Sequence, residues 1–150
     1  PLQLANQAAA IANKGYYITP HFNRNDSMKS DVHTTLVDSD RFDVVHRGMA
    51  RVMTEGTGRW YNIPELQMCG KTGTVQNPHG EDHALFIGFA PMDNPQIAVA
   101  VAVENAGFGA TWACPMATLV MEQYLTGEIN RNALYERMVN ANLIDKENEQ

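Results

Sequence analysis

The stretch 96–104 is the feature that most restricts how this chain can fold. Its apolar core alternates large and small residues, in the order Ile97-Ala98-Val99-Ala100-Val101-Ala102-Val103. A strand formed here has two apolar faces, which predicts that other elements cover both of them. The face made only of Ala leaves room for close helix packing, and we expect the helix that follows this strand to occupy it.

The flanking sequence predicts an antiparallel sheet covered by helices. Stretches 66–76 and 84–90 are expected to form two more strands, and the turn-forming stretch 91–95, rich in Pro and Asn, connects the second of them to 96–104. This spacing suits an antiparallel meander. Apolar residues at helical spacing predict helices near 2–12, 40–55, 115–126 and 131–143. The fold class is therefore α+β, with a short strand at 16–18 and an irregular surface segment at 21–38.

Two of the expected helices have an assigned inner face. In 40–55 this face comprises Phe42, Val45, Met49 and Val52, with Ser39 or Asp40 as the N-cap. In 115–126 it comprises Met116, Leu119, Val120 and Tyr124, and Gly127 ends the helix.

Composition excludes several classes of protein. The net charge of −6 argues against a nucleic-acid binder, because neutralising phosphates requires clustered Lys and Arg. The longest strongly apolar stretch, 97–103, is too short to cross a bilayer. Two cysteines among 150 residues make neither a disulfide framework nor a zinc finger. The chain begins with Pro1 inside a helix signal, so we expect it to be part of a longer protein.

The residues most informative about chemistry are Lys71-Thr72-Gly73, followed by Thr74, within the expected strand 66–76. This tripeptide is the third signature of serine enzymes that act on penicillin-like substrates. About one chain in thirty of this length contains it by chance at average composition. Its position is what makes it informative, because two antiparallel strands and a helix follow it.

The segment Cys69-Gly70-Lys71-Thr72-Gly73-Thr74-Val75-Gln76 resembles the third motif of the penicillin-binding protein transpeptidases. Other segments resemble class B members of that family in the same order: Pro1 to Ala5, Ile18 to His21, Gly48-Met49, Glu55 to Gly58, Phe86 to Pro91 and Asn94 to Val101. Glu104-Asn105 before a Gly-containing turn resembles the elongation-type members. The resemblance implies the C-terminal half of a serine β-lactamase/transpeptidase-like fold over 1–144, followed by a charged tail at 145–150.

The resemblance also implies residue roles. Lys71 would place a fixed positive charge near the substrate carboxylate and a proton-relay serine. Thr72 and Thr74 would offer hydroxyls to that carboxylate, and the Thr74 backbone N–H would lie in the oxyanion hole. Gly73 has no Cβ, which would let the substrate approach the strand. No cofactor and no metal are implied.

The chain departs from the family pattern in its serines. The family also requires Ser-x-x-Lys, which supplies the nucleophile and its base, and Ser-x-Asn. None of Ser27, Ser30 and Ser39 begins either motif. We therefore expect both motifs to lie upstream, and the isolated 150 residues to be inactive and to form no covalent adduct with penicillin.

The parent protein implied by the resemblance is a peptidoglycan D,D-transpeptidase. It would cross-link stem peptides, bind β-lactams, and lie on the periplasmic side of the cytoplasmic membrane, anchored there within a cell-wall elongation complex that maintains cell shape. Two alternatives remain: a β-lactamase or penicillin-sensing domain of the same superfamily, and a non-catalytic binding module. The sequence upstream of Pro1 distinguishes them. The strand 96–104 would also expose an edge through which isolated chains associate.

Two further groups have competing interpretations. His79, Glu81, Asp82 and His83 are metal-ligand types, but their spacing favours a solvated loop at the rim of the site. Cys69 and Cys114 would form a disulfide in an oxidising compartment or serve as small buried apolar residues, and we favour the second interpretation.

Overall fold

The computed structural model describes residues 1–21 and 31–143 of the chain. A three-stranded antiparallel sheet has the order β3-β4-β5, with β3 at Cys69–Val75, β4 at His83–Ala90 and β5 at Ile97–Val103. The predicted meander and the α+β class are confirmed. β3 begins later than the expected residue 66, because Pro64–Leu66 forms a 3₁₀ turn instead.

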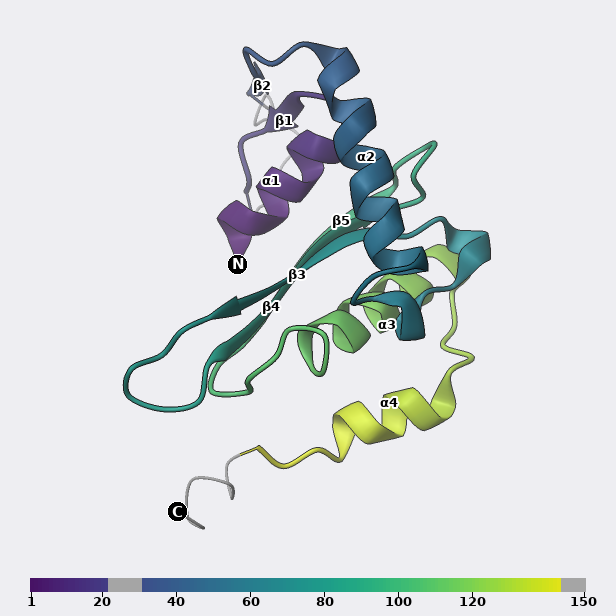
Figure 1. Cartoon of the computed structure of the whole chain (residues 1–150). Helices are drawn as coiled ribbons and strands as arrows, with labels where there is room; N and C mark the ends of the chain where they lie inside the picture. Colours follow the sequence, from purple (N-terminus) through teal and green to yellow (C-terminus); the bar gives the residue numbers. More distant parts are fainter. Residues whose placement is uncertain (22–30, 144–150) are drawn as a thin grey trace.

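Helices cover both faces of the sheet (Figure 1). On one side lie α1 (Leu2–Ala12) and α2 (Ser39–Thr54), and on the other lies α3 (Ala113–Thr126), with α4 (Asn132–Val139) packed against α3. A second small sheet pairs β1 (Tyr16–Ile18) with β2 (Val32–Thr34). The expectation of an irregular segment was therefore wrong at 32–34, where backbone pairing with β1 makes a strand that its own sequence does not signal.

The helix expected on the Ala face of β5 was wrongly assigned. Ala98 packs with Ala12 of α1 and with Cys69 and Phe89, so α1 rather than α3 covers the Ala face. α3 instead packs on the opposite face, which carries Val99. The alternation of β5 shows that both faces are covered, but it says nothing about which helix covers each one.

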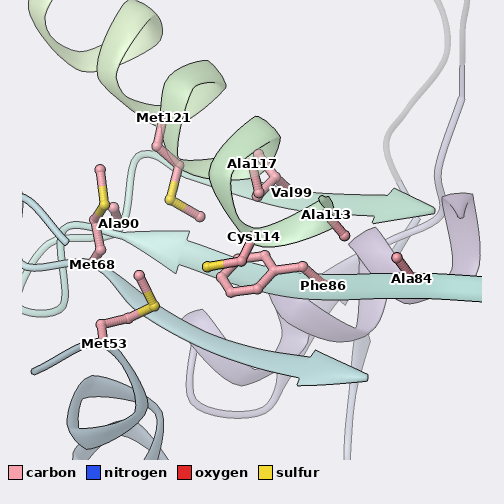
Figure 2. Packing of buried hydrophobic residues seen from close by; sticks show 10 residues of the cluster. All are labelled: Met53, Met68, Ala84, Phe86, Ala90, Val99, Ala113, Cys114, Ala117 and Met121. Atoms are coloured by element: carbon pink, nitrogen blue, oxygen red, sulfur yellow. The ribbon is translucent and has the colours of Figure 1, made fainter. Parts of the chain in front are cut away.

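The core under α3 is built mainly of small residues and Met (Figure 2). Phe86 is its one large ring and is 1% exposed. The buried members of this cluster are Met53, Met68, Ala84, Phe86, Ala90, Val99, Ala113, Cys114, Ala117 and Met121. Small residues on α3 let the helix approach the sheet closely, and flexible Met side chains fill the gaps that remain.

The inner face of α2 was predicted only in part. Phe42 and Met49 are buried as expected, but His46 and Met53 complete the buried face, and Val45 is 41% exposed. His46 is buried because its ring finds partners: Nε2 donates to the Ile11 carbonyl at 2.7 Å, and the ring packs against Phe89. This contact ties α1 and α2 to the sheet.

The predicted boundaries of α2 and α4 also need correction. The N-cap of α2 is Asp38, so Ser39 and Asp40 already lie inside the helix. A Lys14–Asp43 ion pair of 2.7 Å joins the end of α1 to α2 and lowers the pKa of Asp43. The last helix ends at Val139, short of residue 143, and buries Met138. The charged tail at 145–150 lies outside the described residues.

The predicted inner face of α3 was wrong in most of its members. Of its four residues only Leu119 is buried, and Val120 and Tyr124 are 50% and 61% exposed. These exposed side chains and Met116 line an apolar groove of about 560 Å³ between α3, α4 and the start of β5. α3 is apolar on two sides, and helical spacing alone selected the side that faces this groove.

Candidate active-site strand

The Lys71-Thr72-Gly73-Thr74 motif lies in the middle of β3, at the edge of the sheet. Within the described part of the chain, no strand pairs with the outer side of β3. Lys71 and Thr74 are exposed, and Thr72 and Gly73 are half-buried. An open edge leaves backbone N–H and C=O groups unpaired, so an extended peptide can add to it as a further strand.

Close packing from behind fixes the position of β3. A Cβ at Gly70 would overlap the ring of Phe86, so this glycine lets Phe86 fill the core under the strand. A Cβ at Gly109, in the loop before α3, would lie closer than 3.0 Å to the carbonyl oxygens of Gly73 and Leu85. Gly109 therefore supports the motif from the α3 side. The sequence marks it only as part of a turn.

The Lys71 side chain has no acidic partner among the described residues. Its Nζ donates to the backbone carbonyl of Thr72 at 2.6 Å. Among residues 1–21 and 31–143, the ion pairs are Lys14–Asp43, Arg51–Glu55 and Arg131–Glu122, and none includes Lys71. An uncompensated ammonium beside open backbone donors favours an anionic ligand.

A hydroxyl from outside the strand reaches the motif. Thr57 Oγ1 lies 2.8 Å from Thr72 Oγ1, and either atom can be the donor. Thr57 lies between α2 and the 3₁₀ turn Arg59–Tyr61. The sequence segment around Thr57 contributed to the family resemblance, but sequence reasoning gave this residue no role.

The loop between β3 and β4 uses its polar residues to bond to neighbouring segments. The Asp82 carboxylate accepts from the Asn77 backbone N–H at 3.1 Å, and His83 Nδ1 accepts from the Asn105 N–H at 3.0 Å. Asn77 also donates to the Asn105 side chain at 2.7 Å. No group of three or more His, Cys, Asp or Glu in the described residues could hold a metal ion.

Cys69 and Cys114 are both buried, and both are free thiols that form no disulfide. Cys69 belongs to the cluster under α1 and α2, and Cys114 belongs to the cluster under α3, so they lie on opposite sides of the sheet. Burial raises the pKa of each thiol to about 12. The interpretation as small buried apolar residues is confirmed.

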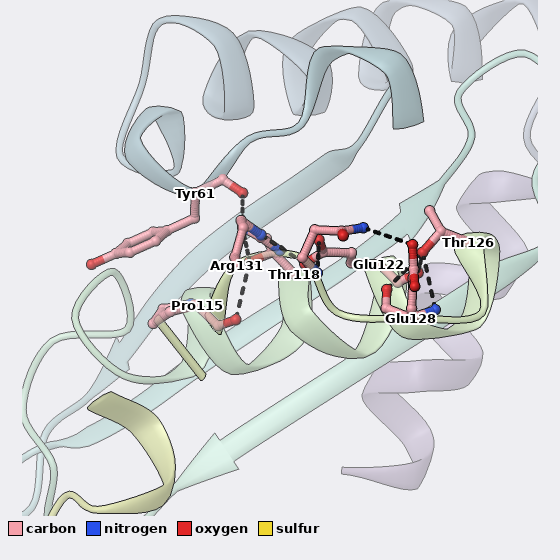
Figure 3. A network of polar contacts seen from close by, with 8 residues as sticks. Tyr61, Pro115, Thr118, Glu122, Thr126, Glu128 and Arg131 are labelled. Carbon is pink, nitrogen blue, oxygen red and sulfur yellow. Dashed lines mark hydrogen bonds and ion pairs between the residues drawn. The ribbon is translucent and has the colours of Figure 1, made fainter. Parts of the chain in front are cut away.

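Arg131, just before α4, connects α3 to the segment before β3 (Figure 3). Arg131 Nε lies 2.8 Å from Glu122 Oε2, and Glu122 is 3% exposed. Arg131 also donates to the Tyr61 carbonyl at 2.8 Å and to Thr118 Oγ1 at 3.3 Å. Sequence reasoning missed this pair, because nine positions separate its members across a helix end.

The described helices include none that is both long and apolar enough to cross a membrane. Of the three serines, Ser39 begins α2, and Ser27 and Ser30 lie outside the described residues. The site as described therefore holds the Lys-Thr-Gly strand and its supports, and none of these side chains is a serine.

Known proteins resemble this chain in both sequence and structure. The peptidoglycan D,D-transpeptidase MrdA of Acinetobacter baumannii is 33% identical over 83% of this chain and 22% of that protein. The crystal structure of PBP2 from Pseudomonas aeruginosa has a TM-score of 0.67 at 37% identity, covering 88% of this chain and 31% of that chain. The ceftriaxone acyl-enzyme complex of penicillin-binding protein A from Mycobacterium tuberculosis has a TM-score of 0.71 at 27% identity, covering 81% and 31%.

This chain thus spans about a fifth to a third of the relatives it matches, with 22% of MrdA and 31% of PBP2. A family model described as the penicillin binding protein transpeptidase domain matches residues 1–122, from α1 into α3. The match includes the whole sheet and the Lys-Thr-Gly strand, and it covers most of the chain. The chain belongs to the penicillin-binding protein transpeptidase family.

Proposed function

We propose that this chain is part of an elongation-type peptidoglycan D,D-transpeptidase, which cross-links cell-wall stem peptides by serine acyl transfer. One observation carries the proposal: in a chain of this family, the Lys71-Thr72-Gly73-Thr74 motif lies on an open sheet edge, with the Lys71 charge uncompensated among the described residues. That edge suits an extended peptide ending in a carboxylate.

In this proposal the motif binds the substrate and stabilises charge. Lys71 and the hydroxyls of Thr72 and Thr74 hold the terminal carboxylate of the stem peptide. The Thr74 backbone N–H donates to the oxyanion that forms when a serine attacks the peptide carbonyl. Gly73 lets the substrate backbone approach β3. The exposure of Lys71 and Thr74 at the sheet edge supports these roles.

The attacking serine comes from a part of the protein outside these 150 residues. Its hydroxyl loses a proton to a neighbouring base and bonds to the penultimate D-Ala carbonyl carbon. Terminal D-Ala leaves after its amine accepts that proton. An amine of a neighbouring stem then attacks the acyl-serine carbonyl and loses a proton, which returns to the serine oxygen as the ester bond breaks. β-Lactams acylate the same serine. The absence of Ser-x-x-Lys from this sequence supports an active site in which this chain supplies the Lys-Thr-Gly strand and another part of the protein supplies the nucleophile.

The setting of the parent protein belongs to the same proposal. Stem peptides lie outside the cytoplasmic membrane, so the domain acts there, held by a membrane anchor and working in a complex for cell-wall elongation. MrdA of Acinetobacter baumannii is a peptidoglycan D,D-transpeptidase, which favours this function over a β-lactamase or a penicillin sensor. A non-catalytic binding module remains the alternative for the 150 residues alone.

Labelling with a fluorescent penicillin tests the proposal. The full-length protein that contains this chain should form a covalent adduct that survives denaturation, and Lys71→Ala should abolish most of the labelling. Lys14→Ala is the matched control, because Lys14 pairs with Asp43 and lies away from the motif. Its labelling should equal that of the wild type.

Two results would contradict the proposal. If the full-length wild-type protein were not labelled, the proposed function would be wrong. A stoichiometric adduct on the isolated 150-residue chain, seen by mass spectrometry, would show that a nucleophile lies within it.

A further inference from the structure

We infer that Thr57 is a positioning residue for carboxylate recognition, acting through the Thr72 hydroxyl. The inference rests on the proposed function, in which Thr72 contacts the carboxylate of the substrate or of a β-lactam. Its starting observation is the 2.8 Å contact between Thr57 Oγ1 and Thr72 Oγ1. This contact joins the segment after α2 to the middle of the motif.

Hydroxyl chemistry fixes the direction of this hydrogen bond once a ligand is bound. A Thr hydroxyl has one hydrogen to donate and two lone pairs that accept. A carboxylate only accepts, so Thr72 must use its single hydrogen for the ligand. The bond with Thr57 then forms only if Thr57 donates and Thr72 accepts. The result is a chain from Thr57 through Thr72 to the carboxylate, in which each bond polarises the next.

The backbone around Thr57 holds it in position for this role. The Gly56 N–H donates to the Arg51 carbonyl at 2.9 Å, and the Gly58 N–H donates to the Val52 carbonyl at 3.0 Å. Both bonds fasten the segment to the last turn of α2.

The two glycines flanking Thr57 permit this close approach. A Cβ at Gly56 would lie 2.8 Å from the Val52 Cα, and a Cβ at Gly58 would lie 2.6 Å from the Met53 sulfur. The Thr57 backbone is therefore held on both sides, and its side chain needs little ordering to reach β3.

Changing the carboxylate of the ligand tests this role. The quantity measured is the second-order rate constant for acylation of the full-length protein. Benzylpenicillin has the carboxylate, and its methyl ester lacks the charge. Thr57→Val keeps the shape of the side chain and removes the hydroxyl. We expect Thr57→Val to lower the constant for benzylpenicillin by about three- to tenfold, the factor that one neutral hydrogen bond carries.

The remaining measurements distinguish a positioning role of Thr57 from a purely structural one. The constant for the methyl ester should fall less in Thr57→Val, because a neutral ester carbonyl accepts a weaker hydrogen bond from Thr72 than a carboxylate does. Thr57→Ser should restore the value for benzylpenicillin. In a Thr72→Val background, Thr57→Val should have no further effect. Thr54→Val is the matched control, because the Thr54 hydroxyl donates to the Ala50 carbonyl of its own helix, at 3.3 Å.

The outcomes distinguish this inference from the function on which it rests. If the wild type is not acylated, the proposed function fails. Suppose instead that the wild type is acylated. If the acylation rate constant of Thr57→Val is then unchanged, or is lowered by the same factor for both ligands, the positioning role is overturned and the proposed function stands. Melting temperatures identify a variant that misfolds, and in that case Thr57→Ala replaces Thr57→Val in the same comparison.

Discussion

At the scale of single residues, two reactive side chains of β3 differ in their exposure to solvent. Lys71 is exposed, whereas Cys69, two positions earlier on the same face of β3, is fully buried. The strand passes from the core at Cys69 to the surface at Lys71 and beyond. The Cys69 thiol therefore helps to anchor the motif and takes no part in its chemistry.

The two buried thiols predict how stability depends on alkaline pH. Their pKa in the folded protein is about 12, against an ordinary value of 9.0. Folding favours the neutral thiols, so their contribution is complete below pH 9.0 and is lost as the pH rises toward 12. Urea unfolding at a series of pH values should show the free energy of unfolding decreasing in this window.

The Cys69→Ala, Cys114→Ala variant is the control for this measurement. It should be less stable at neutral pH, because its buried side chains are smaller, and its stability should depend less on alkaline pH. An equal alkaline slope in the two proteins would show that other groups cause the decrease.

At the scale of elements, one loop that precedes β3 in the sequence and one that follows it support this strand. The segment after α2 reaches Thr72 through Thr57, and the loop before α3 packs on Gly73 through Gly109. The motif is therefore positioned by elements that flank the sheet, as well as by its pairing with β4.

Gly109→Ala should destabilise the protein by about 1–3 kcal/mol, the cost of overfilling a well-packed site. The added methyl group meets the backbone of Gly73 and Leu85, which cannot move without shifting β3. Gly48→Ala is the contrasting variant. Gly48 lies within α2, and a methyl group added there would meet nothing within 4 Å, so Ala should stabilise the helix by about 0.5–1 kcal/mol.

Thermal or urea unfolding of both variants checks this pair of predictions. Equal stability changes in the two variants would show that space around residue 109 is not the controlling factor.

The Arg131–Glu122 pair connects three elements, and removing one partner should be costly. Arg131→Met leaves the Glu122 carboxylate buried and without its cation, and it also breaks the bond to the Tyr61 carbonyl. We expect a loss of about 3–5 kcal/mol in the free energy of unfolding. Arg51→Met, in the exposed pair with Glu55, should change it by only about 0.5 kcal/mol.

Urea unfolding of the two Met variants supplies the comparison. Similar losses of unfolding free energy in the two variants would mean that burial does not determine how much each ion pair stabilises the protein.

At the scale of the whole molecule, the described sheet is covered on its faces but open at its sides. Within residues 1–21 and 31–143, no strand pairs with the outer side of β5. Beside β5 runs the apolar groove that includes Ile97, Val120 and Tyr124. Unpaired backbone next to exposed apolar side chains favours pairing between chains.

We therefore expect the isolated chain to self-associate through β5. Light scattering should show a mass that rises with protein concentration. Ala102→Lys places a charge on this edge and should shift the protein toward the monomer. Val44→Lys is the control, because Val44 is 61% exposed on α2, and its charge should not change the association. A monomer at every concentration would contradict the prediction.

Much of the fold, and the strand on which the candidate site lies, could be predicted from local patterns. The meander, the four helices and the position of the motif on the first strand of the meander all follow from residues close together in the sequence. The predictions that failed concern orientation: α1 rather than α3 covers the Ala face of β5, and α3 buries a different side from the one expected. Helical spacing identifies an apolar side but not its partner.

The sequence by itself determined that a strand carrying Lys71-Thr72-Gly73 precedes a strand with two apolar faces, because side-chain alternation is a property of the local backbone. Only the tertiary structure decided what supports the motif. Thr57 meets Thr72, Gly109 meets Gly73, and Arg131 reaches Tyr61 across long stretches of chain. Such contacts depend on how the elements pack together, and no local pattern of residues records them.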